Sequence, residues 1–120
     1  MLTAIIMLRA QPAWLRLTRA ERRSQGEQHF GAVRSRHPDV TSRYFDAEAF
    51  TTRCSDVLLI EAPSMREYTF FIDSLRDTPL IADEYFSFVE IIPMIEDSYD
   101  DYEAAHPDTI GGASSWPTRS

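Results

Sequence analysis

Two stretches of the sequence carry side chains that could perform chemistry, and the first is residues 22–33, RRSQGEQHFGAV. It places Arg22 and His29 beside a thin apolar helix face that holds Phe30. A histidine titrates near neutral pH and can carry a proton, and an arginine can bind or polarise an oxygen. We predict His29 as a proton carrier, with Arg22 and Phe30 as substrate contacts. In the competing interpretation the helix packs closely, Arg22 extends outward to solvent and His29 is structural.

The second stretch is residues 43–56, RYFDAEAFTTRCSD, where charges of both signs alternate with aromatic residues. Two carboxylic acids in one site can divide the roles of general acid and general base. The competing interpretation is a surface hairpin whose exposed ion pairs contribute little. The complete predicted site has catalytic His29, Asp46 and Glu48 and substrate-binding Arg22, Phe30, Arg43 and Tyr44.

The composition excludes several kinds of chemistry. All 12 basic residues are arginines, so a lysine Schiff base, the usual pyridoxal phosphate site and a lysine-containing phosphate loop cannot form. Cys54 is the one cysteine, so neither an intramolecular disulfide nor a cysteine-rich zinc site is available. The three histidines show no ligand spacing. We therefore predict no metal and no cofactor.

Charge and hydropathy limit which partners and which cellular compartment are expected. The net charge of −7 disfavours nucleic acid and anionic membranes as partners. The apolar opening MLTAIIML lacks a basic start and is too short to span a bilayer, so a strand is expected there. A single cysteine fits a reducing compartment, and we predict a cytoplasmic protein.

The first half of the chain has the pattern of a strand, a helix and a strand. Residues 2–8 are a nearly continuous apolar run, typical of a strand buried on both faces. Thr18 and Glu21 have the spacing of a capping box, which predicts a helix over residues 19–36. Residues 40–46 are rich in β-formers but mixed in polarity, which predicts a second strand.

The second half of the chain repeats this order. Residues 56–61, DVLLIE, are another apolar run and predict a third strand. The sequence SMRE at 64–67 repeats the capping signature, and a helix is expected over residues 65–77. Residues 86–97 predict a final strand that Pro93 interrupts.

The predicted order β-α-β-β-α-β is that of the ferredoxin-like fold. In that fold the first and third strands are central, and here these two are the apolar ones. The second strand carries Arg43 and Asp46 and the fourth carries Pro93, as suits edge strands. We predict an α+β domain over residues 1–97, followed by an acidic, flexible tail over residues 98–120.

In such a fold the helices cover only one of the two faces of the sheet. Both helices pack on one face, yet the central strands are apolar on both faces. A second copy of the sheet is the simplest cover for the open face. We therefore predict a homodimer with its sheets packed face to face, which is a dimeric α+β barrel.

The two predicted helices differ in how well they fill the core. The second helix aligns Tyr68, Phe71 and Leu75 on one face at helical spacing. The first helix has Gly26 at its middle, where glycine costs about 1 kcal/mol relative to alanine, and Val33 about two turns beyond. We predict a cavity beneath the first helix that can hold a small molecule. Close packing of the helix on the sheet is the alternative.

Four stretches in combination resemble one family. They are PAWLRLTRAER, RYFDAEAF, DSLRDTP and EIIPMIED, and together they resemble the darcynin family of small bacterial proteins over roughly residues 1–103. The resemblance implies a ferredoxin-like domain similar to dimeric α+β barrels. It implies no established activity, so it supplies no catalytic residues.

The function is predicted by analogy with other proteins of this fold. We predict a cofactor-independent enzyme, a cyclase or isomerase that uses acid/base catalysis on a small apolar or aromatic molecule of specialised metabolism. The alternative is a non-catalytic module that binds a small molecule or another protein. In that case Phe70 and the acidic tail would be the contact surfaces.

Overall fold

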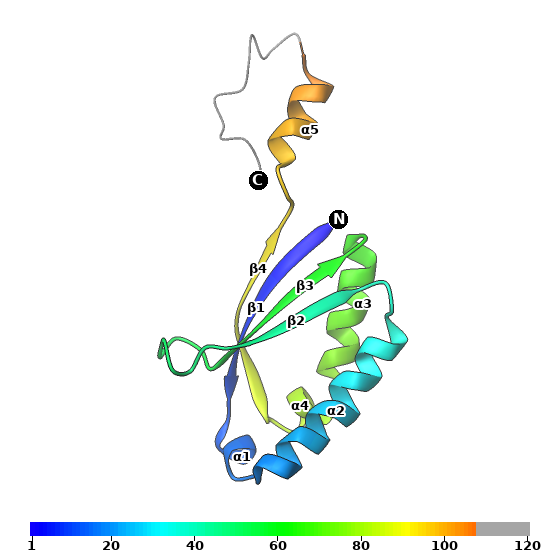
Figure 1. Ribbon diagram of the computed structural model, residues 1–120. Coiled ribbons are helices and arrows are strands. Elements are labelled where there is room, and N and C mark those ends of the chain that lie inside the picture. Colours follow the sequence, from blue (N-terminus) through cyan, green and yellow to red (C-terminus); the bar gives the residue numbers. More distant parts are fainter. Residues whose placement is uncertain (108–120) are drawn as a thin grey trace.

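The computed structural model describes residues 1–107, which form a four-stranded antiparallel sheet with helices packed on one face (Figure 1). Without the short helices and the last helix, the order is β-α-β-β-α-β, so the predicted α+β ferredoxin-like fold is confirmed. The elements are β1 (Leu2–Ala10), α1 (Pro12–Leu15), α2 (Arg19–Arg36), β2 (Thr41–Asp46), β3 (Asp56–Ala62), α3 (Met65–Arg76), α4 (Pro79–Ala82), β4 (Phe86–Met94) and α5 (Ser98–Ala105).

The strand order in the sheet is β2-β3-β1-β4. The two apolar strands β1 and β3 are therefore central, and β2 and β4 are the edges, as the sequence predicts. Pro93 pairs with Ala4 on the edge strand β4, where a missing N–H is tolerated. A β-bulge shifts the register between Met7 and Leu8, which locally bends β4 against β1.

Of the two capping signals in the sequence, the one before α2 forms a capping box and the one before α3 does not. Thr18 and Glu21 form the predicted capping box, with the Glu21 N–H donating to Thr18 Oγ1 over 3.1 Å and the Thr18 N–H donating to Glu21 Oε1 over 2.9 Å. These bonds hold the pKa of Glu21 below its ordinary value. Ser64 makes no such backbone bond, because its hydroxyl donates to the carboxylate of Glu67 instead.

The core lies between the sheet and the two long helices. Side chains alternate along β1 and β3, so that Ile6 and Ile60 point toward the helices and are completely buried. Phe71 of α3 and Val33 of α2 are the other large side chains that are completely buried. The core is therefore built mainly on β1, β3 and α3.

The opposite face of the sheet is largely apolar, and no helix within residues 1–107 covers it (Figure 1). Because paired residues of antiparallel strands share a face, the pairs Ile5–Leu59, Ile5–Ile92 and Met7–Val57 place their side chains here. Ile92 is 39% exposed, and the other four side chains are intermediate in exposure. We call this surface the open face.

Three elements were not predicted from the sequence. The helices α1 and α4 are single turns, each with a proline at its start, where proline favours helix initiation. The helix α5 occupies the beginning of the predicted tail, residues 98–120, and extends beyond the sheet (Figure 1). Residues 108–120 of that tail lie outside the described part, and the domain boundary at residue 97 stays a prediction.

No helix within residues 1–107 combines the length and the apolar character that a bilayer crossing requires. The cytoplasmic location stays a prediction.

Candidate functional site

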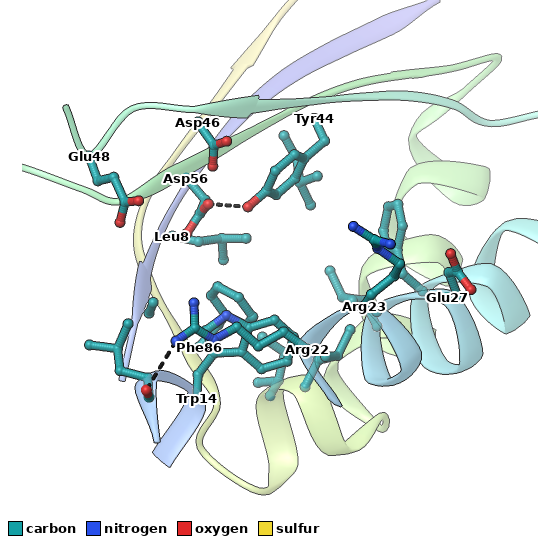
Figure 2. A pocket seen from close by; sticks show the side chains of 18 of the residues that line it. Leu8, Trp14, Arg22, Arg23, Glu27, Tyr44, Asp46, Glu48, Asp56 and Phe86 are labelled. Atoms are coloured by element: carbon teal, nitrogen blue, oxygen red, sulfur yellow. Dashed lines mark hydrogen bonds between the residues drawn. The ribbon is translucent and has the colours of Figure 1, made fainter. Parts of the chain in front are cut away.

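A cavity of about 690 Å³ lies between α2 and the sheet (Figure 2). Its apolar wall comes from both central strands, β4 and the short helices. Its polar wall comes from the first half of α2 and from the ends of β2 and β3. The lining residues are Leu8, Ala10, Trp14, Leu15, Arg19, Arg22, Arg23, Gly26, Glu27, Phe30, Tyr44, Asp46, Glu48, Asp56, Leu58, Leu75, Leu80, Ile81 and Phe86.

The cavity exists because the first half of α2 brings little volume to the sheet. Val33, near the end of the helix, is its one buried residue. Gly26 lies on the cavity wall, and a Cβ atom added there would meet no atom within 4 Å. The helix therefore does not pack closely at Gly26. The space predicted beneath this helix is present, and the alternative of close packing is wrong at this position.

The end of the cavity near α1 is aromatic. The indole of Trp14 lies 4.7 Å from the ring of Phe86 and 5.5 Å from the ring of Tyr85, measured between centroids. Both pairs are tilted, as aromatic side chains prefer. This cluster fixes α1 against β4 and gives the cavity a flat apolar surface.

Three arginines, Arg19, Arg22 and Arg23, line the cavity from the first two turns of α2. Arg22 bends toward α1, where its Nη2 donates to the Leu15 carbonyl over 3.0 Å. Its Nε atom is buried and has no hydrogen-bond partner. A buried N–H without an acceptor is costly. The Arg22 side chain lines the cavity, and its positive charge suits an acidic group that enters there.

Asp56 faces the cavity at the start of β3 (Figure 2). It is 6% exposed and is the one charged residue among the buried residues of 1–107. Its carboxylate accepts hydrogen bonds from the Tyr44 hydroxyl and from Ser55 Oγ, the latter over 2.6 Å. Burial raises the pKa of Tyr44 far above its ordinary value, and the Asp56 carboxylate, with Asp46 and Glu48 nearby, raises it further. The phenol therefore stays protonated and acts as a donor.

The structure brings five of the seven predicted site residues to this cavity. The exceptions are His29, which is not among the lining residues, and Arg43, whose guanidinium lies 5.1 Å from the ring of Phe45 on the open face. The five that line the cavity are Arg22, Phe30, Tyr44, Asp46 and Glu48.

Sequence reasoning missed Asp56, Arg19 and Arg23 as site residues. The signal for Asp56 was available, because period-2 alternation along DVLLIE places it on the same face as Leu58 and Ile60. An acid on the buried face of a central strand is unusual and marks a candidate site. The described residues include no group of three or more acidic, histidine or cysteine side chains placed to hold a metal ion.

Comparisons with known proteins agree with this architecture. The family model described as "Darcynin, domain of unknown function" matches residues 1–111. A darcynin from Chromobacterium violaceum is 50% identical over 72 residues, which are 60% of this chain and 91% of that protein. Darcynin 1 from Acinetobacter baumannii is 41% identical over 88 residues, 73% of this chain and 98% of that protein.

The chain belongs to the darcynin family. The predicted resemblance is thereby confirmed, and it extends over nearly the whole chain.

Solved structures share the fold at low sequence identity. A heme-binding protein from Thermus thermophilus matches with a TM-score of 0.70 and 13% identity over 86% of this chain and 44% of the other. A mutant chlorite dismutase from Candidatus Nitrospira defluvii matches with a TM-score of 0.65 and 11% identity over 97% of this chain. That match covers 51% of the dismutase, so this chain spans about half the length of such proteins.

These structures correct the functional prediction. A dimeric chlorite dismutase from Nitrobacter winogradskyi also matches, with a TM-score of 0.61 and 20% identity over 77% of this chain and 54% of the other. The related structures are thus named for heme binding and chlorite dismutation. The prediction of a cofactor-independent cyclase or isomerase is therefore wrong. It rested on analogy with other proteins of the same fold, which does not determine function.

Proposed function

We propose that the cavity beneath α2 binds a flat, mainly apolar small molecule that carries acidic groups, the class of ligand to which heme belongs. The observation that carries this proposal is the set of three arginines, Arg19, Arg22 and Arg23, on the wall of an otherwise largely apolar cavity of about 690 Å³. Acidic groups form strong charge-assisted hydrogen bonds with guanidinium groups. One solved protein of the same fold is named as a heme-binding protein, which favours the same class.

The shape of the cavity supports a flat ligand. Trp14 and Phe86 form its aromatic end, and Leu8, Leu58 and Leu80 supply aliphatic surface from three further elements. Ligand pockets are typically apolar with a few polar groups that fix orientation. The three arginines of α2 would hold the acidic groups of the ligand, while these walls cover its apolar body.

The cavity fits the ring and acidic groups of heme better than its iron. None of the lining residues is a histidine, cysteine or methionine, which are the common axial ligands of heme iron. Tyr44 can in principle bind iron as a phenolate, but its hydroxyl donates to Asp56 and its pKa is raised. We therefore assign the protein ligand binding and derive no reaction step at an iron atom.

Titration with protoporphyrin IX and with hemin tests this proposal, because the two differ only at the centre of the ring, where hemin holds iron and protoporphyrin IX holds two N–H groups. We expect the two dissociation constants to agree within about threefold, since the protein contacts the ring and the acids. Arg22→Gln should weaken both about tenfold, the effect of losing one charge-assisted contact. Arg34→Gln, on an exposed turn of the same helix, is the matched control. Absence of binding, or hemin binding a hundredfold more tightly, would refute the proposal.

We also propose that the protein is a homodimer whose open faces pack together. The open face is apolar on both central strands, and apolar sheet faces are normally covered. The chlorite dismutase chains are about twice as long as this chain, so a second copy would supply comparable length. One of the related proteins is itself described as dimeric.

Light scattering tests the dimer. We expect the mass of two chains at micromolar concentration and the mass of one chain for Leu59→Asp, which places a charge at the centre of the open face. Phe70→Asp is the control, because Phe70 is 48% exposed on α3, on the other side of the sheet. A dimer that survives Leu59→Asp but not Phe70→Asp would place the interface on α3 instead.

A further inference from the structure

The cavity has two ends of opposite charge (Figure 2). Arg19, Arg22 and Arg23 lie on the α2 side. On the strand side, Asp56 starts β3, and Asp46 and Glu48 lie at the end of β2 and just beyond it. In Figure 2, Asp46, Asp56 and Glu48 lie on the sheet side of the cavity, and Arg22 and Arg23 lie on α2, which also carries Glu27 beside Arg23. A uniformly anionic ligand would satisfy only one of these ends.

The charges at the two ends are not neutralised within the described protein. Asp56 is 6% exposed, and its hydrogen-bond donors are the neutral hydroxyls of Tyr44 and Ser55. Arg22 donates to a backbone carbonyl and keeps one buried N–H without a partner. The ion pair between Arg53 and Glu90 lies outside the cavity and neutralises neither end. Buried charges are normally paired with a charge of opposite sign.

The Asp56 carboxylate also retains hydrogen-bonding capacity. Each carboxylate oxygen can accept about two hydrogen bonds. Tyr44 donates to Oδ1 and Ser55 donates to Oδ2, which leaves an acceptor position on each oxygen. A donor that carries positive charge would satisfy both this capacity and the missing charge.

We infer that the natural ligand is bipolar, with an acidic group held by Arg22 and an ammonium or other cationic N–H group held by Asp56, on either side of a flat apolar body. This inference rests on the proposed ligand-binding function and specifies the class of ligand. Heme itself carries acidic groups but no cationic N–H group, so it would occupy the arginine end and leave Asp56 without a counter-ion.

Three rigid naphthalenes of matched size test this inference on the wild-type protein. The bipolar compound is 6-(aminomethyl)-2-naphthoate; 6-methyl-2-naphthoate lacks the cation, and (6-methyl-2-naphthyl)methylammonium lacks the acid. Competition with bound protoporphyrin IX gives their relative affinities. We expect the bipolar compound to bind about tenfold more tightly than either other compound, the gain from one additional well-formed ionic contact.

Two variants locate the ends of the ligand. Asp56→Asn, which keeps the shape of the side chain, should abolish the advantage of the bipolar compound over 6-methyl-2-naphthoate. Glu61→Gln is the control, because Glu61 lies on the same strand but outside the cavity. If Asp56→Asn destabilises the fold, the comparison of the three compounds on the wild-type protein still decides the question.

The outcomes separate this inference from the proposed function. Failure of protoporphyrin IX to bind would refute the proposed function and, with it, the bipolar ligand. Binding of protoporphyrin IX without preferential displacement by the bipolar compound would overturn the bipolar ligand alone. An advantage of the bipolar compound that persists in Asp56→Asn would also overturn it, because the cation would then be bound elsewhere.

Discussion

The helices α2 and α3 cover the same face of one sheet, yet they contact it in different ways. α3 buries Phe71, Ile72 and Leu75, whereas the longer helix α2 buries Val33 alone. The two helices meet where Phe30 contacts the edge of Phe71, with ring centroids 6.0 Å apart. Beyond that contact, toward its N-terminus, α2 lines the cavity instead of the core.

This difference shows how a small domain can keep a cavity and remain folded. β1, β3 and α3 together supply most of the residues of the buried core. The N-terminal half of α2 is held largely by local interactions, namely the capping box of Thr18 and Glu21 and the bond from Arg22 to the Leu15 carbonyl. Such interactions fix a helix without filling the space beneath it.

Truncating one aromatic side chain on each helix should give the largest difference in the free energy of unfolding between α2 and α3. Phe71→Ala should lower the free energy of unfolding by about 3–5 kcal/mol, because Phe71 is completely buried. Phe30→Ala should cost about 1 kcal/mol, because its side chain is only partly buried beside the cavity. Urea unfolding of both variants measures the two losses. Equal losses would mean that α2 contributes to the core as much as α3 does.

Substituting the capping residue of each helix should give a smaller difference in the free energy of unfolding. Thr18→Ala should lower the free energy of unfolding by about 1 kcal/mol, because Thr18 Oγ1 accepts the Glu21 N–H. Ser64→Ala should cost less than about 0.5 kcal/mol, because Ser64 does not cap the backbone of α3. Thermal melts of the two variants provide the measurement. The account of α2 as a locally stabilised helix fails if Ser64→Ala is the more damaging change.

A further effect concerns the cavity wall opposite α2 and appears only at high pH. The pKa of Tyr44 is raised in the folded protein, so the folded state retains a proton that the unfolded chain loses near pH 10. Stability from this group is therefore complete below pH 10 and declines as pH rises further. Tyr44→Phe should show a shallower decline between pH 10 and 11.5 in chemical unfolding experiments. Identical profiles for the wild type and Tyr44→Phe would contradict the assignment.

Most of the fold follows from local sequence signals. The capping box predicted the start of α2 at Arg19, and apolar runs identified β1 and β3 as the central strands. Pro93 correctly marked β4 as an edge strand. The short helices α1 and α4 were missed because single turns carry too few residues to show a 3.6-residue period.

The site was harder to predict because it depends on which faces meet in three dimensions. Arg43 and Tyr44 are adjacent on a strand, so alternation places them on opposite faces, and only Tyr44 lines the cavity. Helical spacing places His29 on one side of the α2 face that lines the cavity and Arg23 and Glu27 on the other side. Arg23 and Glu27 line the cavity, whereas His29 is not among the lining residues. The alternation of its strand places Asp56 on the buried face, but its part in the site also required knowing that the cavity reaches the start of that strand.

The central claim is that the thin face of α2 leaves a ligand cavity at Gly26, and filling this position tests it most directly. We would titrate protoporphyrin IX into the wild type, Gly26→Leu and Gly31→Leu. Both glycines have open space around an added Cβ and both substitutions favour the helix, but only Gly26 lines the cavity. The account predicts that Gly26→Leu weakens binding at least tenfold without loss of stability, while Gly31→Leu binds like the wild type. Equal binding by all three proteins would contradict it.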